Sequence, residues 1–145
     1  MDDVSEGLGK TLPEIPATAC VAGVGIDLES VSRVRDAVGR YGDAFLAKVF
    51  LPEEIELCRS RGAHVWESFA ARWAAKEAFS KALGTGIGEA VGFTDFGVLS
   101  EANGAPRIVF SEKGKLALQN AGAGKALVSL THTAEFAEAV VVLTL

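Results

Sequence analysis

Two carboxylates and a lysine in this 145-residue chain have the residue types and the spacing that phosphate chemistry needs. Asp27 follows an apolar stretch in which glycine occupies every second position, a pattern that marks close approach by a ligand or another backbone. Glu77 and Lys81 are four residues apart, which places them on one face of a helix. In a helical projection, Glu77 falls in the middle of the apolar side formed by Trp66, Phe69, Ala70, Trp73 and Ala74. Because an ionised carboxylate facing a core is costly without a cationic partner, the pattern predicts a cation beside Glu77.

The chemistry of this residue set favours a hard metal ion and a phosphate. Two carboxylates without a cysteine or histidine cluster suit Mg²⁺ or Mn²⁺, and Mg²⁺ keeps coordination sites for water and phosphate oxygens. Lys81 would reach the same phosphate as a point charge. The loop GTGIG (residues 84–88) offers backbone N–H groups to a phosphate but lacks the GxxxxGK[ST] pattern of a Walker A loop. The residues alone therefore predict Mg²⁺-dependent chemistry on a phosphate ester.

Each of these features also has a plainer interpretation, which the residues leave open. Glu77 and Lys81 can form an ordinary helix ion pair, and Asp27 can cap the helix that follows it. The glycines of the loop can simply end the long helix, and His132 can be a hydrogen-bonded structural residue.

Composition limits the classes of partner. The length indicates one domain, and 49% hydrophobic residues provide enough material for a core. A net charge of −5 argues against a nucleic-acid partner, although Arg33, Arg35 and Arg40 can form a local basic patch for an acidic protein. The two cysteines form no disulfide framework, the N-terminus does not resemble a signal peptide, and the last apolar run is too short to span a membrane. We therefore expect a cytoplasmic protein without a membrane partner.

The elements that must position these residues follow from periodicity, capping signals and turn signals. Residues 1–18 are predicted to be a flexible extension, and residues 19–145 a single domain. Too few strands alternate with helices for a doubly wound sheet, so the predicted class is α+β, with a small antiparallel sheet packed on a long central helix. The expected strands cover residues 20–28, 93–99, 108–110, 127–131 and 139–143. The first expected helix begins at Ser30 or Ser32 and ends at Gly39 or Gly42. One or two short helices are expected within residues 43–60, with a helix start at Pro52. The long helix is expected over residues 64–83, and a short one over residues 112–120 after Ser111.

Two motifs resemble the signature pair of the 4′-phosphopantetheinyl transferases. These are GIDL (residues 25–28) and, about fifty positions later, FAARWAAKEAFSKALG (residues 69–84). The short chain and the GTGIG loop resemble the holo-acyl-carrier-protein synthase branch, and NGAP (103–106) and SLTHT (129–133) resemble the later blocks of the family. The likeness covers residues 21–145, although the stretch 39–63 carries no recognisable motif.

The resemblance implies the fold of that family, its reaction and its site residues. Members transfer the 4′-phosphopantetheine arm of coenzyme A to a serine of an apo acyl carrier protein or carrier domain, in fatty-acid or polyketide biosynthesis. By resemblance, Asp27 and Glu77 hold Mg²⁺, Glu77 takes the serine proton directly or through a metal-bound water, and Lys81 assists the leaving phosphate. Arg33 is implied to dock the acidic carrier, and the short members imply a homotrimer with active sites between subunits. The implied coenzyme A residues are Arg72, Lys81, Gly84, Thr85, Gly86, Gly104, Pro106, His132 and Thr133.

Two hypotheses compete with the enzyme. A non-catalytic module that binds coenzyme A or a carrier would be expected to lack Asp27, Glu77 or Lys81, and all three are present. An unrelated Mg²⁺-dependent phosphotransferase would need a nucleotide phosphate loop. The helical projection also turns Arg72 and Lys76 away from Glu77, so we expect them to meet phosphates or a neighbouring subunit.

Overall fold

The computed structural model describes residues 20–145, so the extension predicted for residues 1–18 lies outside the described part. The α+β class is confirmed, with four helices, one 3₁₀ turn and five strands within the described residues. Their order is β1 (Val21–Ser30), α2 (Val31–Val49), α3 (Pro52–Arg59), η1 (Gly62–His64), α4 (Val65–Leu83), β2 (Phe96–Ser100), β3 (Pro106–Phe110), α5 (Glu112–Asn120), β4 (Lys125–His132) and β5 (Phe136–Thr144).

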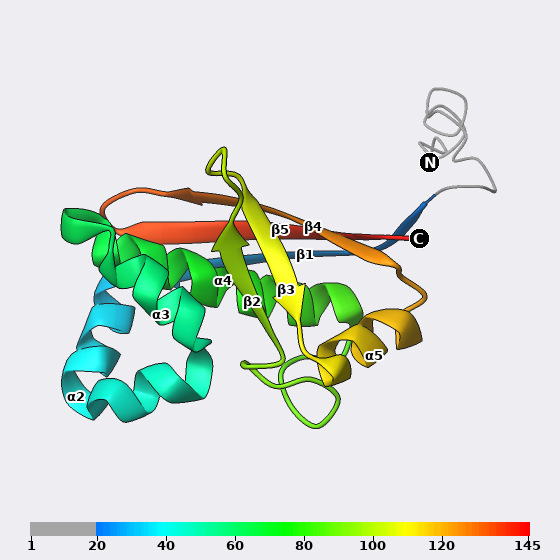
Figure 1. Ribbon diagram of the computed structural model, residues 1–145, viewed down its shortest axis with the longest axis horizontal. Coiled ribbons are helices and arrows are strands. Elements are labelled where there is room, and N and C mark those ends of the chain that lie inside the picture. The colour runs from blue at the N-terminus through cyan, green and yellow to red at the C-terminus, as the bar shows by residue number, and fades with distance from the viewer. Residues whose placement is uncertain (1–19) are drawn as a thin grey trace, which may run out of the picture.

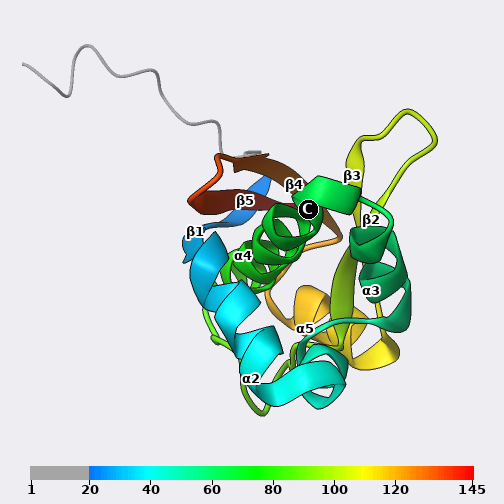
Figure 2. The ribbon, with the colours of Figure 1, turned by 90° about the vertical axis from the view of Figure 1, so that its left-hand side faces the viewer.

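The strands form two antiparallel sheets around the long helix α4. The larger sheet has the order β1-β5-β4, and β2 pairs with β3 in a separate hairpin. Figure 1 shows α4 lying along the three-stranded sheet, with α2 and α3 at one end of the molecule and α5 at the other. The end-on view in Figure 2 places α4 in the middle, between the sheet and the layer that contains α2, α3 and the hairpin. No helix within residues 20–145 is long and apolar enough to cross a membrane.

The glycines of β1 allow this strand to lie directly against the backbone of α4. A Cβ atom at Gly23 would overlap the carbonyl oxygen of Ala82, and one at Gly25 would overlap that of Ala78. The close approach predicted from the glycines is therefore made by α4. Since Gly23 lies at Ala82 and Gly25 at Ala78, β1 runs toward the middle of α4, and Asp27 on the same face of β1 comes within reach of the Lys81 side chain.

The predicted apolar side of α4 is buried in part. Phe69, Ala70 and Ala74 lie in the core, whereas Trp66, Trp73 and Glu77 are half-buried and Lys81 is exposed. The face that carries Arg72 and Lys76, which the projection placed away from Glu77, is buried as well. The physical reason is that α4 is buried around most of its circumference and that most of its own buried residues are small, so periodicity alone does not identify the side that faces the core.

The ends of the helices mostly follow the capping signals. Ser30 caps α2, and its side chain accepts a hydrogen bond from the Arg33 N–H at 3.3 Å, so Asp27 is not the capping residue. Pro52 begins α3, and Ser111 caps α5 as expected. The predicted stop near Gly42 is a kink, since Gly42 adopts φ +66° and the helical segment continues to Val49.

Candidate active site

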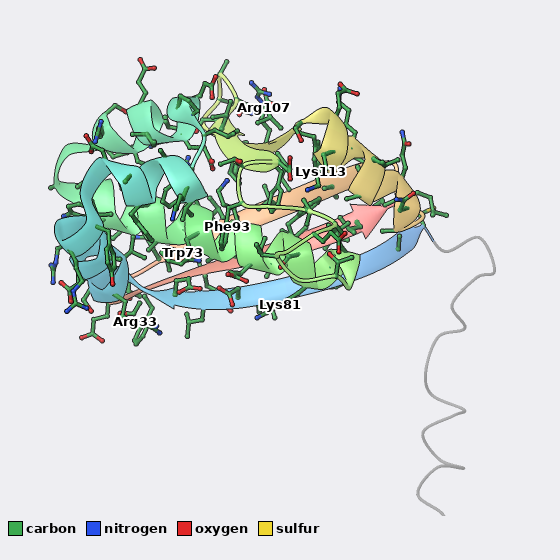
Figure 3. All side chains as sticks on the ribbon, turned by 90° about the horizontal axis from the view of Figure 1, so that it is seen from below. Arg33, Trp73, Lys81, Phe93, Arg107 and Lys113 are labelled. Carbon is green, nitrogen blue, oxygen red and sulfur yellow. The ribbon has the colours of Figure 1, made fainter. Side chains whose placement is uncertain are left out.

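The first part of the site lies where β1 meets α4. Lys81 Nζ donates to Asp27 Oδ1 at 2.9 Å and to the Ile26 carbonyl at 3.0 Å, so this lysine joins the helix to the strand. The hydrogen bond from Lys81 to Asp27 raises the pKa of Lys81, and the charges of Glu77 and Glu29 act in the same direction. The predicted residues Asp27, Glu77 and Lys81 are thus brought together, although the close ion pair joins Lys81 to Asp27 rather than to Glu77. Figure 3 shows Lys81 beside β1.

Glu29 is a third carboxylate in this group, and the sequence analysis missed it. Burial raises the pKa of Glu29 to about 8, and a hydrogen bond with Asp27 and the charges of Asp27 and Glu77 add to the effect. The signal was present in the sequence, because residues two apart on a strand project from the same face. We define Asp27, Glu29, Glu77 and Lys81 as the acidic cluster.

The acidic cluster has the chemistry of a site for a hard cation. The Asp27 side chain is only 13% exposed, and its Oδ2 is buried without a hydrogen-bond partner. Such a carboxylate oxygen is costly unless a cation reaches it or a neighbouring donor, here the protonated carboxyl of Glu29, turns toward it. Residues 20–145 contain no group of three or more His, Cys, Asp or Glu side chains arranged to hold a metal by themselves. The arrangement therefore fits an ion such as Mg²⁺, which takes one or two protein carboxylates and fills its other positions with water and phosphate oxygens.

The second part of the site is a polar cavity of about 730 Å³. Arg61, His64, Arg72 and His132 line it, and we call it the cationic pocket. Arg72 is held in place, since its Nε donates to the Val98 carbonyl at 3.0 Å and its Nη1 to Ser68 Oγ at 2.9 Å. Two arginines with two histidines suit a ligand that carries several phosphate oxygens. Arg61 and His64 were not predicted, because no motif marks the stretch before α4.

The structure divides the predicted coenzyme A residues between different places. The first group, Arg72, Gly104, Pro106 and His132, lines the cationic pocket. The second group follows the C-terminus of α4: Gly84 ends the helix with φ +79°, as the plainer interpretation predicts, and Thr85 lines a separate cavity of about 410 Å³ together with Leu83 and Lys113. The hydroxyl of Thr133 accepts the N–H groups of Glu135 and Phe136 in the turn between β4 and β5.

These two parts lie on different sides of α4. Lys81 reaches β1, whereas Arg72 reaches Val98 on β2. Arg33 is exposed near the start of α2, and Figure 3 shows it at the end of β1 that leads into α2, on the same side of the molecule as Lys81. The residues predicted to bind metal and to dock the carrier therefore share one side of the chain, and the cationic pocket opens elsewhere.

The expectation that Lys76 meets a phosphate or a neighbouring subunit is wrong. Its side chain is fully buried, so neither can reach it. Its Nζ lies 2.7 Å from Glu54 Oε1, in an ion pair that joins α4 to α3. The projection could not show this, because the partner comes from a distant part of the chain.

Comparisons with known proteins agree on one family. The sequence pattern of the 4′-phosphopantetheinyl transferase superfamily matches residues 23–140. The chain is 42% identical over 123 residues to the holo-[acyl-carrier-protein] synthase of Koribacter versatilis, covering 85% of this chain and 98% of the relative. It is 41% identical to that of Ruminiclostridium cellulolyticum, covering 84% of this chain and 91% of the relative.

Solved structures give the same result. The Neisseria meningitidis holo-[acyl-carrier-protein] synthase superposes with a TM-score of 0.77 at 32% identity, covering 85% of this chain and 98% of that one. The Helicobacter pylori synthase in complex with coenzyme A gives a TM-score of 0.73 at 35% identity, covering 83% of this chain and 98% of that one.

Proposed function

Because the chain belongs to the 4′-phosphopantetheinyl transferase superfamily, in its holo-[acyl-carrier-protein] synthase branch, we propose that it transfers 4′-phosphopantetheine from coenzyme A to a serine of an apo carrier protein. The observation that carries this proposal is the acidic cluster, in which Asp27 with its orphaned oxygen, Glu77 and Lys81 act on one another across β1 and α4. A non-catalytic relative would have no need to keep this combination.

The proposed reaction uses a small number of groups. Asp27 and Glu77 would hold Mg²⁺, which when bound supplies charge neutralisation at the pyrophosphate. Glu77 takes the proton of the carrier serine, directly or through a water. The serine oxygen forms a bond to the phosphorus on the pantetheine side, and the bond from that phosphorus to the bridging oxygen breaks. Lys81 stabilises the charge on the departing adenosine 3′,5′-bisphosphate.

The cationic pocket is the proposed site for the nucleotide end of coenzyme A. Its volume and its two arginines suit an adenosine that carries phosphates. Since this pocket and the acidic cluster lie on different sides of α4, we propose that one subunit contributes the pocket and a neighbouring subunit contributes the cluster.

The outer face of the three-stranded sheet supports this assembly. Large apolar side chains on it are between 45% and 60% exposed, and the strand register places Val24 opposite Val142 and Val142 opposite Leu127. Although Glu138, Thr131 and Ser129 also lie on this face, exposed large apolar side chains gathered on one surface mark an interface. The exposed members of this sheet face are Val24, Ile26, Leu28, Leu127 and Phe136. We propose that it forms the interface of the homotrimer implied by the family resemblance.

Arg33 is the proposed docking residue for the carrier. It is exposed on the first turn of α2, beside a shallow cavity also lined by Asp36, Arg40 and Tyr41. An arginine at a rim steers an acidic partner and sets its orientation more than it adds affinity. A cytoplasmic location and a role in fatty-acid biosynthesis complete the proposal.

The decisive experiment measures transfer directly. The full chain is incubated with coenzyme A, Mg²⁺ and a panel of apo carrier proteins, and intact masses are recorded with and without a chelator. One carrier should gain the mass of a single phosphopantetheine arm, and chelation should prevent the gain. Glu77→Gln should remove most of the rate, whereas Glu56→Gln, an exposed acid on α3, should not. Full activity of Glu77→Gln would refute its role, and coenzyme A binding without any mass gain would favour the non-catalytic module.

A further inference from the structure

The buried ion pair between Lys76 and Glu54 also holds the backbone of β2 and of the segment before it. Both side chains are 0% exposed, and Lys76 Nζ lies 2.7 Å from Glu54 Oε1. The same Nζ donates to the carbonyl oxygens of Phe93 and Phe96, each at 2.7 Å. All three N–H donors of the ammonium group are thereby used, so Lys76 has no capacity left for a substrate.

Glu54 extends this network to the wall of the cationic pocket. Its Oε1 accepts the Leu51 N–H and its Oε2 accepts the Val98 N–H, both at 2.9 Å. The carbonyl of the same Val98 accepts from Arg72 Nε at 3.0 Å. Glu54 therefore holds the N–H of Val98, and Arg72 holds the carbonyl of the same residue. This residue of β2 links the ion pair to the guanidinium in the pocket.

Stability alone does not explain a charged pair at this place. Replacing a buried ion pair with apolar residues of similar volume is often neutral or stabilising, because desolvation offsets most of the attraction between the charges. Directional hydrogen bonds from fixed charges do, however, define positions. The close fit supports this reading, since a Cβ at Gly97 would meet the Glu54 carboxylate at 2.9 Å.

We propose that the Lys76–Glu54 pair is a positioning device that fixes Val98 and, through Val98, holds the Arg72 guanidinium where the cationic pocket receives the phosphate-bearing end of coenzyme A. This inference rests on the proposed function. The acidic cluster lies against β1 and shares no hydrogen bond with the network among the described contacts. The pair should therefore govern coenzyme A binding and leave the chemical step nearly unchanged.

Two variants separate position from stability. Glu54→Gln keeps the size of the side chain, but its amide has a single acceptor oxygen and cannot accept both the Leu51 and the Val98 N–H groups as the carboxylate does. The double variant Glu54→Leu/Lys76→Met removes both charges of the pair and leaves no side-chain acceptor for the Val98 N–H, so it should recover stability without restoring the contact to Val98. Leu118→Ala on α5 is the matched control, because Leu118 is buried in the core and takes no part in the network or the pocket.

The measurements are calorimetric coenzyme A binding, the separate values of KM and kcat for transfer, thermal stability, and exchange of the Arg72 Nε–H with water by NMR. Both Glu54→Gln and the double variant should weaken binding and raise KM for coenzyme A by about tenfold, with kcat near the wild-type value and faster Nε–H exchange. Leu118→Ala should lower thermal stability without changing KM.

Two results would count against the inference in different ways. Wild-type KM and binding in the double variant, while the wild-type protein binds normally, would show that the pair has only a structural role. Absence of coenzyme A binding by the wild-type protein would refute the proposed function, and with it the pocket assignment on which this inference rests.

Discussion

Replacing Gly25 with alanine should separate β1 from α4 and disable the acidic cluster that lies between them. The added Cβ would overlap the Ala78 carbonyl oxygen, well inside the 3.4 Å at which ordinary contacts begin. The obstacle is helix backbone, so no side-chain rotation can relieve the overlap. Either the strand or the helix must move, and Asp27 on the strand would move relative to Glu77 and Lys81 on the helix.

The expected magnitudes follow from this geometry. Forcing an extra carbon into a packed interior typically costs about 1–3 kcal/mol, and a clash with backbone belongs at the upper end. A displacement of about 1 Å within a catalytic group costs about 10²-fold in rate. We therefore expect the free energy of unfolding of Gly25→Ala to fall by about 3 kcal/mol, and the transfer rate per folded molecule to fall by about 10²-fold.

A second glycine of the same chain provides the control. Gly39 lies within α2, and a Cβ there meets nothing within 4 Å, so Gly39→Ala should stabilise the protein by about 0.5–1 kcal/mol. Urea denaturation followed by circular dichroism gives the unfolding free energies, and the carrier mass shift gives the rates under conditions where each variant is folded. Wild-type stability and turnover of Gly25→Ala would refute the argument that β1 rests on the backbone of α4.

Two further perturbations test the electrostatics and the sheet face. Because folding raises the pKa of Glu29 from 4.5 to about 8, the folded state binds a proton that the unfolded state has lost, so the urea midpoint without metal should fall as pH rises from 5 to 8. Glu29→Gln should reduce this fall, and an unchanged pH profile in that variant would show that another group is responsible. Ile26→Glu, on the exposed sheet face, should lower the oligomeric mass in light scattering and abolish transfer, whereas an intact active oligomer would contradict the proposed interface.

Local sequence signals predicted the helix starts well, because the interactions that begin a helix join residues only a few positions apart. Ser30 and Ser111 each begin a helix by accepting a hydrogen bond from the next turn, and Pro52 begins α3 because its fixed φ suits the first helical position, so local rules identified all three. Strand ends were less accurate: β2 begins at Phe96 instead of residue 93, where the Phe93 carbonyl accepts a hydrogen bond from Lys76. That contact joins residues 17 positions apart, beyond the reach of a periodic pattern.

The candidate site was predictable where a motif carries it and not elsewhere. Asp27, Glu77 and Lys81 were identified and lie together. Glu29 was missed although it lies two residues from Asp27, because a single acid at the end of a strand resembles a solvated charge. Arg61 and His64 reach the cationic pocket through the path of the chain after α3, which no local rule predicts. The burial of Lys76 depended on Glu54, 22 residues away, and a helical projection contains no information about that partner.

Helix α4 has almost no surface position at which a substitution would be tolerated. One side lies on β1 so closely that only glycine is accommodated opposite it, a second carries Glu77 and Lys81, and a third carries Arg72 and Lys76. Efforts to redirect this protein toward a different carrier should therefore leave α4 untouched and diversify the exposed surface of α2. Three arginines of α2 are exposed there, namely Arg33, Arg35 and Arg40. A library restricted to that surface tests the proposed docking role of Arg33 and leaves the acidic cluster unchanged.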